Sequence, residues 1–274
     1  MGFIDVIKER ARANKKVIVL PETEDRRTYE ATAQILKEGI ADVVLVGSEE
    51  AVRKGSEGLD ITGAVIVDPA TSDKTQAYVD KLVELRSKKG MTPEQAREIL
   101  LNQYLYYGVM MVKMGDADGM VSGACHSTAD TLRPCLQILK TKPGTKLVSA
   151  FFLMVVPDCE YGANGTFVFA DSGLNQNPTP EELAAIAASS AESFKLLVEE
   201  EPVVAMLSHS TKGSAKHADV DKVVEATRIA KEQNPELKLD GEFQLDAAIV
   251  PSVGASKAPG SEVAGKANTL IFPD

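Results

Sequence analysis

The chain has no tryptophan, only three cysteines, and aromatic residues at 5% of its 274 positions. The three thiols, Cys125, Cys135 and Cys159, cannot all pair and lack zinc-ligand spacing, which indicates a reducing compartment. No apolar stretch approaches the roughly 18 residues of a membrane span, and the N-terminus lacks the apolar segment of a signal peptide. These absences predict a cytoplasmic protein that spans no membrane.

Basic residues are also scarce, with 30 lysines and arginines against 40 aspartates and glutamates and a formal net charge of −10. Nucleic-acid and anionic-membrane surfaces need basic patches, and the sequence has no long basic run, so neither partner is expected. An anionic ligand would need a local basic pocket. No acidic or histidine cluster has metal-ligand spacing and no GxGxxG motif follows a strand, so neither a metal nor a nicotinamide cofactor is expected.

The sequence does contain a regular alternation of short apolar runs and helical patterns, which is typical of βαβ units and a mostly parallel sheet. Capping boxes at Thr92–Gln95 and Thr179–Glu182 mark two helix starts. Strands are expected at 17–20, 42–47, 65–68, 119–121, 146–155, 166–170, 203–207 and 269–272. Helices are expected at 28–39, 74–86, 93–115, 180–197 and 219–233.

A turn of lysine, proline and glycine at 141–145 indicates a domain crossing. We therefore expect a first α/β domain at residues 1–143 and a second at residues 144–274. The last expected strand is followed by no crossover, although a parallel strand needs one. The chain is accordingly expected to stop short of a complete fold.

Residues 117–134 carry the strongest functional signal. An expected buried strand opens there into a segment dense in hydroxyl groups that leads to a cation, and its candidates are Ser127, Thr128, Thr131 and Arg133, with His126 beside them. Ligands bind beyond the carboxyl ends of parallel strands, where amides, hydroxyls and a cation hold anions. The segment therefore predicts phosphate or carboxylate binding, with an ordinary helix cap as the alternative.

Two helix starts fit this segment. In one, Ser127 is the N-cap residue with Asp130 at the third helical position. In the other, Pro134 is the first helical residue, because the residue before a proline avoids helical angles. Both place hydroxyl groups at the start of a helix.

Other candidates have plain alternatives. Arg86 lies with Lys88 and Lys89 shortly before Gly90 and fits a solvated helix end. Lys212 lies in a glycine and serine loop that lacks the GxxxxGK[ST] pattern, so a polar turn fits equally well. Lys257 would contact a polyanion or merely solvate its loop. Cys159 follows a strand end, but no histidine is close in sequence, so we interpret it as a thiol beside a site and not as a nucleophile.

These segments resemble the phosphate acetyltransferase (phosphotransacetylase) family. The matching segments, in order, are LPETEDRRT, ADVVLVG, ELRSKKGMTPEQA, VSGACHSTADTLRP, VPDCEYG, FADSGLN, MLSHSTKGSAKH and KAPGSEVAGKANTLIFPD. The resemblance implies two α/β domains with an inter-domain cleft, like those of isocitrate dehydrogenase, in a homodimer. It also implies the reversible reaction of acetyl-CoA with phosphate to give acetyl phosphate and coenzyme A (CoA).

The resemblance also implies roles for individual residues. Arg133, Ser127, Thr128 and Thr131 would bind phosphate, Arg86 and Lys257 would bind CoA, and Cys159 and His126 would lie beside the active site. CoA is expected as a substrate, with no tightly bound cofactor. Direct attack of the CoA thiolate in a ternary complex is expected. The base, a Ser-Arg pair and the segment completing the first domain are expected beyond Asp274.

Three other readings stay open at this point. The acyl group could be butyryl, because nothing in the sequence sizes the acyl pocket. The chain could be a catalytically silent module that binds CoA or acyl phosphate. A metal-dependent enzyme with the isocitrate dehydrogenase fold is the third reading, although its acidic metal ligands are not evident.

Overall fold

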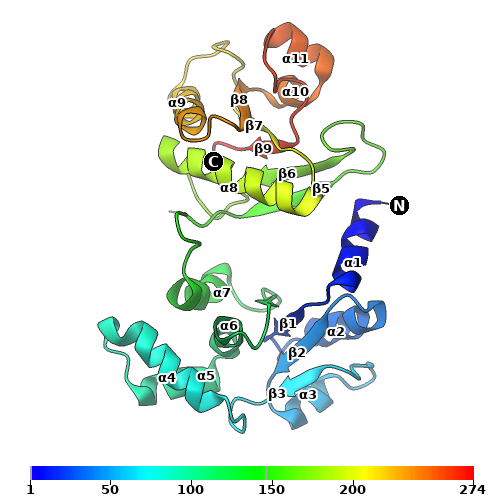
Figure 1. The fold of residues 1–274 in the computed structure, drawn as a ribbon, viewed down its shortest axis with the longest axis vertical. Helices are drawn as coiled ribbons and strands as arrows, with labels where there is room; N and C mark the ends of the chain where they lie inside the picture. The colour runs from blue at the N-terminus through cyan, green and yellow to red at the C-terminus, as the bar shows by residue number, and fades with distance from the viewer. Residues whose placement is uncertain (1, 146) are drawn as a thin grey trace. The chain divides into compact units, whose positions relative to one another are not determined.

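The structure is a computed structural model and describes residues 2–145 and 147–274. The chain forms two compact units, residues 1–140 and residues 141–274, divided at the start of the turn at 141–145. Each unit holds its own sheet with helices packed against it (Figure 1). No helix in the described part of the chain is long and apolar enough to cross a membrane.

The first unit is built on a parallel sheet with the strand order β3-β2-β1-β4. Its strands are β1 (Val17–Leu20), β2 (Asp42–Val46), β3 (Val65–Val67) and β4 (Gly119–Met120). Its helices are α1 (Phe3–Ala13), α2 (Arg26–Glu38), α3 (Glu49–Gly55), α4 (Thr75–Arg86), α5 (Pro93–Asn102), α6 (Tyr104–Met114) and α7 (Thr128–Pro134), with short 3-10 and π segments at Ser87–Lys89 and Cys135–Leu139.

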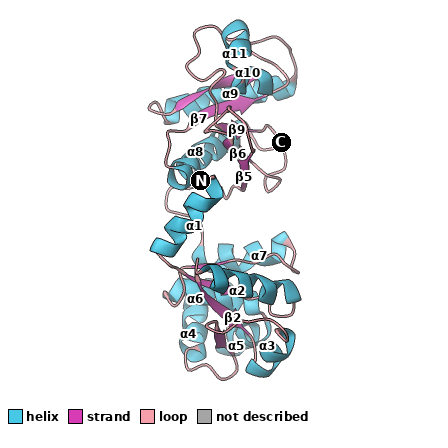
Figure 2. Ribbon diagram, turned by 90° about the vertical axis from the view of Figure 1, so that its right-hand side faces the viewer, coloured by secondary structure: helices cyan, strands magenta, loops and turns pink. Residues whose placement is uncertain are grey.

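Alternate residues of these strands point to opposite faces of the sheet, and each face has its own helices. On one face, Leu20 and Leu45 pack with α2 and α3 around the buried Tyr29. On the other face, Val19 and Val44 pack with α4, α5 and α6. Figure 2 shows the helices of this unit on both sides of its strands. This arrangement leaves the ends of the strands as the places where a ligand can bind.

The single helix expected over residues 93–115 is wrong, because the structure has two helices there. The backbone at Gln103 leaves the helical region, with φ −127° and ψ 89°, between α5 and α6. Helix α5 buries a narrow stripe, whereas most of α6 is buried, so one straight helix would not suit both. The capping boxes expected at Thr92 and Thr179 are both confirmed.

The second unit has a sheet in the order β5-β6-β9-β7-β8, in which β5 and β6 are antiparallel and the other pairs are parallel. The expected α/β fold with mostly parallel sheets is therefore confirmed. The strands are β5 (Phe151–Val155), β6 (Thr166–Ala170), β7 (Val203–Leu207), β8 (Lys238–Phe243) and β9 (Thr269–Ile271). The helices are α8 (Pro180–Val198), α9 (Ala218–Gln233), α10 (Leu245–Ile249) and α11 (Pro251–Lys257).

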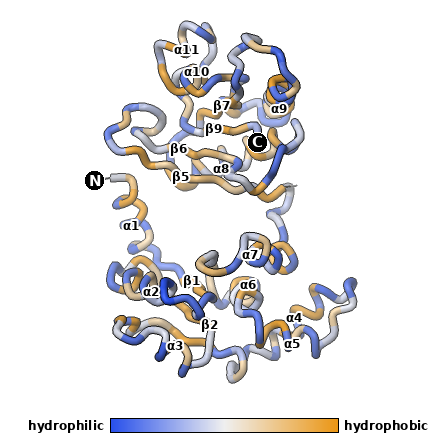
Figure 3. Tube along the Cα trace, turned by 180° about the vertical axis from the view of Figure 1, so that it is seen from behind, coloured by the Kyte–Doolittle hydropathy of each residue, from blue (hydrophilic) through white to orange (hydrophobic). Residues whose placement is uncertain are grey.

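Two strands of this sheet differ from expectation. The strand expected over 146–155 begins only at Phe151, and residue 146 lies outside the described residues. Its apolar residues colour β5 orange in Figure 3. Strand β8 has no counterpart among the expected strands, because Asp240, Gly241 and Glu242 interrupt its apolar pattern. Both carboxylates of β8 are nevertheless buried, at 9% and 3% exposed.

Each sheet has a point at which the chain reverses the direction in which it adds strands. In the first unit the chain moves from β1 out to β3 and then returns to place β4 on the other side of β1. In the second unit it moves through β7 to β8 and then inserts β9 between β6 and β7. Ligands of open α/β sheets bind at such points, beyond the carboxyl ends of the strands.

Candidate active site

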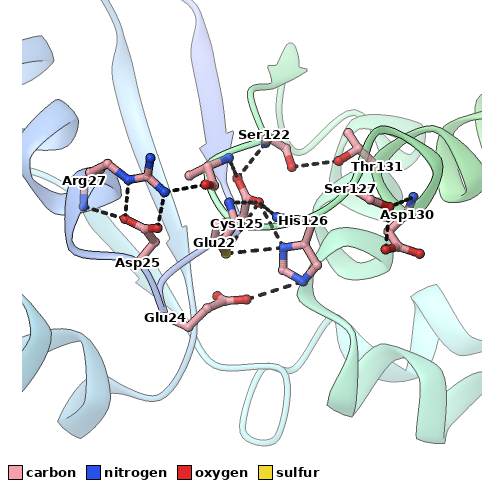
Figure 4. Close-up of polar contacts among 12 residues, drawn as sticks. Glu22, Glu24, Asp25, Arg27, Ser122, Cys125, His126, Ser127, Asp130 and Thr131 are labelled. Carbon is pink, nitrogen blue, oxygen red and sulfur yellow. Dashed lines mark hydrogen bonds and ion pairs between the residues drawn. The ribbon is translucent and has the colours of Figure 1, made fainter. Parts of the chain in front are cut away.

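A buried carboxylate and a loop of backbone amides meet beyond the ends of β1 and β4 (Figure 4). Glu22 follows β1 and is 2% exposed. The N–H groups of Gly123 and Ala124 donate to its Oε2, both at 2.7 Å. Those of Cys125 and His126 donate to its Oε1, both at 3.0 Å. These four N–H groups of the loop therefore donate their hydrogen bonds to a carboxylate of the chain itself.

The imidazole of His126 lies against the same carboxylate. Its Nδ1 is 2.9 Å from Glu22 Oε1, and its Nε2 is 3.5 Å from Glu24 Oε1. Burial by itself would raise the pKa of Glu22, but the loop amides and the His126 side chain lower it to about 2. Glu22 is therefore ionised throughout the physiological pH range, and it can only accept hydrogen bonds.

The thiol of Cys125 completes this cluster. Desolvation and the negative charges of Glu24 and Glu22 raise its pKa to about 11, so the thiol is neutral at physiological pH. Possible ligand atoms of Glu22, Cys125 and His126 lie within 4.8 Å of one another. A metal would need the thiolate and free carboxylate lone pairs. The carboxylate oxygens of Glu22 already accept four amide N–H groups, and this occupancy opposes a metal at this position.

Helix α7 begins directly after this loop. Ser127 is its N-cap residue, since its Oγ accepts from the Asp130 N–H at 3.1 Å and donates to Asp130 Oδ2 at 2.7 Å. This confirms the first of the two expected helix starts. The start at Pro134 is wrong, because that residue lies inside the helix. Thr128 is exposed and Thr131 half-buried on the same helix.

A hollow of about 390 Å³ opens beside α7. Arg133 and His126 line it, together with Tyr104, Tyr106 and Asp130. The Arg133 side chain is 56% exposed, and its Nη1 lies 3.3 Å from Asp130 Oδ1. An exposed ion pair of this kind contributes at most about 1 kcal/mol. The guanidinium group can therefore exchange this partner for an anionic ligand at little cost.

Arg86 is the last residue of α4, and its charge acts on the hydroxyl group of Tyr106. Burial raises the pKa of Tyr106, and the charges of Arg133 and Arg86 oppose that rise. Both guanidinium groups therefore act electrostatically on the same hydroxyl group. The Nε atom of Arg86 is buried and has no hydrogen-bond partner among the described residues. A donor left in this state is one that a ligand oxygen would satisfy.

Two candidates from the sequence belong to the second unit. Lys257 ends α11, and its Nζ donates to Gln244 Oε1 at 3.0 Å and to Asp246 Oδ2 at 2.8 Å. Cys159 lies in the loop between β5 and β6, half-buried against the core that contains Phe167. The structure thus gathers Arg86, His126, Ser127, Thr128, Thr131 and Arg133 in the first unit and places Cys159 and Lys257 in the second.

The glycine and serine loop after β7 repeats the arrangement found after β4. The Gly213 N–H and the Ser210 Oγ both donate to Glu242 Oε1 at 2.8 Å. Lys212 Nζ donates to Asp240 Oδ1 at the same distance. Because the donors of this loop form hydrogen bonds with carboxylates of β8, the structure favours a polar turn over a phosphate-binding loop. A hollow of about 600 Å³ nearby adjoins the ends of β7 and β9.

Glu22, Glu24 and Tyr106 are absent from the residues that the sequence singles out. The available signal for Glu22 is its place directly after an expected strand, where a carboxylate faces the crevice at the strand ends. Tyr106 gives no such signal, because it stands in an apolar helical run. Its polar surroundings come from other segments of the chain.

Residues 2–274 match the model of a family described as phosphate acetyl/butaryl transferase. The chain is 57% identical over 274 residues to a phosphate acetyltransferase from Acetivibrio thermocellus, covering 100% of this chain and 82% of that protein. A phosphate acetyltransferase from Thermoanaerobacterium thermosaccharolyticum is 56% identical, covering 100% and 83%. A solved phosphotransacetylase from Streptococcus pyogenes matches with a TM-score of 0.89 at 45% identity, covering 99% of this chain and 81% of that one.

Proposed function

The chain belongs to the phosphate acetyl/butaryl transferase family, and from this premise we propose that it transfers acetyl groups reversibly between CoA and phosphate. The observation that carries the proposal is the match of the whole chain to relatives named phosphate acetyltransferase. The chain is thus an acyltransferase, and the proposed reaction is a step of acetate metabolism.

The proposed chemistry is a direct displacement in a ternary complex. The CoA thiol gives its proton to the base that the family resemblance implies, and the thiolate sulfur attacks the carbonyl carbon of acetyl phosphate. A carbon–sulfur bond forms, the bond from that carbon to the phosphate oxygen breaks, and phosphate leaves with the electron pair. Such a step needs aligned reactants and groups that stabilise the developing negative charge.

At the phosphate end, Arg133 is proposed to bind the phosphoryl group. Its planar guanidinium can donate to two phosphate oxygens at once, and it lines the hollow beside α7. The other proposed contacts are Ser127, Thr128 and Thr131, with His126 beside them. The hydroxyl group of Ser127 already caps α7, so its contribution includes holding the helix start in place.

At the CoA end, Arg86 and Lys257 are proposed to contact the phosphates of the substrate. The buried, unpartnered Nε of Arg86 supports its assignment. The ion pair of Lys257 with Asp246 is exposed on both sides, at 38% and 51%, so it can be exchanged. Cys159 is proposed to lie beside the active site without forming an acyl-enzyme.

No tightly bound cofactor is proposed, since CoA enters and leaves as a substrate. A cytoplasmic location is supported by the three cysteines, all of which are free thiols. The acidic net charge supports the proposal that neither nucleic acid nor a membrane surface is a partner.

A homodimer is also proposed, with β5 at its interface. This strand stands at the edge of its sheet. Phe152 and Met154 alternate along it and are 60% and 36% exposed, and Val155 at its end and Val156 just after it are 39% and 41% exposed. A row of exposed apolar side chains at a sheet edge is typical of a protein interface. A second copy of the chain is the proposed occupant, because symmetric dimers are the commonest assembly.

The test is the CoA-dependent conversion of acetyl phosphate to acetyl-CoA by the purified chain, followed by the absorbance of the thioester. Acetyl-CoA should form only when CoA, acetyl phosphate and protein are all present. Butyryl phosphate serves as the comparison substrate and should react more slowly. Binding of CoA without turnover, both by this chain and by one extended beyond Asp274, would contradict the proposed activity.

A further inference from the structure

Glu22 is a buried ionised group that has no role in the proposed displacement reaction. It accepts four backbone N–H groups from four consecutive residues of one loop. An uncompensated buried carboxylate would cost several kcal/mol, on the order of the penalty for burying any single charge. Four amides for two oxygens make a site built to hold a carboxylate, and they fix the backbone of the loop in one conformation.

The same carboxylate also fixes one imidazole. Because ionised Glu22 can only accept, the 2.9 Å contact places the hydrogen of His126 on Nδ1. Nε2 is then the free ring nitrogen of His126 in the hollow that Arg133 lines. Its charged neighbours are Glu24, at 3.5 Å, and Asp130 and Arg133, which line the same hollow.

We propose that Glu22 is a positioning residue, which holds His126 so that Nε2 accepts a hydrogen bond from the P–OH group of inorganic phosphate bound by Arg133. This inference rests on the proposed function and adds a group to its phosphate end. Glu22 itself touches no substrate. Its effect passes through the imidazole orientation and through the loop that leads into α7.

Glutamine in place of Glu22 would disrupt the arrangement in either orientation. Each carboxylate oxygen faces at least two N–H donors. An amide NH2 group at either position would point donors at donors. The loop and the imidazole would then have to move, so Glu22→Gln separates a positioning role from simple filling of space.

The first measurement is nitrogen-15 NMR of the histidine side chains in the wild-type chain, which has three histidines. The His126 signals, assigned with His126→Asn, should report the Nδ1–H tautomer. Added inorganic phosphate should shift the Nε2 signal. An Nε2–H tautomer, or no response of Nε2 to saturating phosphate, would overturn the inference.

The second measurement compares Glu22→Gln with a matched control. Asp171→Asn is the control, because Asp171 is also buried and accepts N–H groups of a loop, from Leu174 and Asn175, in the other unit. Glu22→Gln should change the tautomer signals of His126 and raise the KM for inorganic phosphate, in the conversion of acetyl-CoA to acetyl phosphate, about tenfold, the effect of losing one hydrogen bond to a charged group. Asp171→Asn should leave the His126 signals unchanged.

The outcomes for the two proposals can be told apart. Turnover of acetyl phosphate with unaltered His126 signals in Glu22→Gln would refute the positioning role and leave the proposed function standing. Absence of turnover, both in this chain and in one extended beyond Asp274, would refute the proposed function, while the tautomer would still report on Glu22. If Glu22→Gln does not fold, the wild-type phosphate titration alone decides.

Discussion

At the scale of single residues, Glu22 ionises well below its ordinary range because the fold surrounds it with donors. Burial favours the neutral acid, but the loop amides and the imidazole favour the carboxylate more strongly. The residue is a fixed negative charge in an anion site built by the chain. Arg133 is its opposite, an exposed charge whose weak ion pair leaves it open to a ligand.

The Glu22→Gln variant should lose stability in a pH-dependent way. The pKa of Glu22 falls from its ordinary 4.5 to about 2 on folding, so ionisation stabilises the fold fully above pH 4.5. This contribution is lost as the pH falls towards 2. The difference in free energy of unfolding between wild type and variant, from urea titrations at about pH 7, 5 and 3, should therefore be nearly the same at pH 7 and pH 5 and smaller at pH 3. An equal difference at every pH would contradict this account.

Arg133→Ala should impair phosphate binding without unfolding the chain. We expect the KM for acetyl phosphate to rise at least about tenfold, because a charged hydrogen-bonding group is lost. The free energy of unfolding should change by less than about 0.5 kcal/mol, as for other exposed sites. The KM of Arg133→Lys should lie between those of the wild type and Arg133→Ala, since lysine lacks the planar fork of the guanidinium group.

A suitable control for this series is Arg97→Ala. Arg97 is another exposed arginine of the first unit and donates to Gln76 Oε1 on the surface. It should retain the wild-type KM. Equal kinetics for Arg133→Ala and Arg97→Ala would remove Arg133 from the phosphate site.

At the scale of elements, two loops of similar composition bind carboxylates from a neighbouring strand. The loop after β4 binds Glu22, which follows β1. The loop after β7 binds Glu242 of β8. Glycine and serine leave amides exposed at strand ends, and an internal carboxylate satisfies them as well as a phosphate would. Loop composition alone therefore does not identify a phosphate site.

Strand β8 contains buried carboxylates that need hydrogen-bond donors, and this leads to a prediction for Asp240→Asn. Asp240 accepts from Lys212, Lys231 and Ser261, at 2.8, 2.6 and 2.7 Å. Its loss should lower the free energy of unfolding by about 2 kcal/mol in urea titrations. Breaking a fully buried pair costs about 3–5 kcal/mol, and both lysines here are more than a third exposed. Glu236→Gln, an exposed change just before β8, should have no measurable effect.

At the scale of the whole molecule, strand order decides where polar groups can meet. The return of the chain past β1 brings residues after β4 next to residues after β1. Glu22 and Gly123 lie 101 positions apart in the sequence, yet they share a hydrogen bond. The candidate site therefore follows from the topology of the first sheet.

The proposed homodimer gives a prediction at this scale. Phe152→Ser should convert the dimer to a monomer in sedimentation velocity, because Phe152 is the most exposed of the apolar side chains on β5. Leu196→Ser is the matched control, since Leu196 is another exposed apolar residue of the same unit, 74% exposed, and belongs to α8 and not to β5. A monomeric wild type, or equal effects of both changes, would contradict an interface on β5.

Helix caps, most strands and the family can be inferred from the amino-acid sequence alone. Helix caps at Thr92, Ser127 and Thr179 follow from short spacings, and most strands follow from apolar runs, since both depend on neighbouring residues alone. Ordered motifs identified the family, and Arg133 and His126 stood out as polar residues after a strand.

The hydrogen-bond partners of the buried charged groups, in contrast, become visible only in the tertiary structure. The roles of Glu22 and of the buried acids in β8 depend on donors contributed by distant segments. The break at Gln103 likewise reflects how two helices meet one core. Burial and hydrogen bonding of a charge are set by what packs around it, and that is fixed by strand order, not by the residues beside it in the chain.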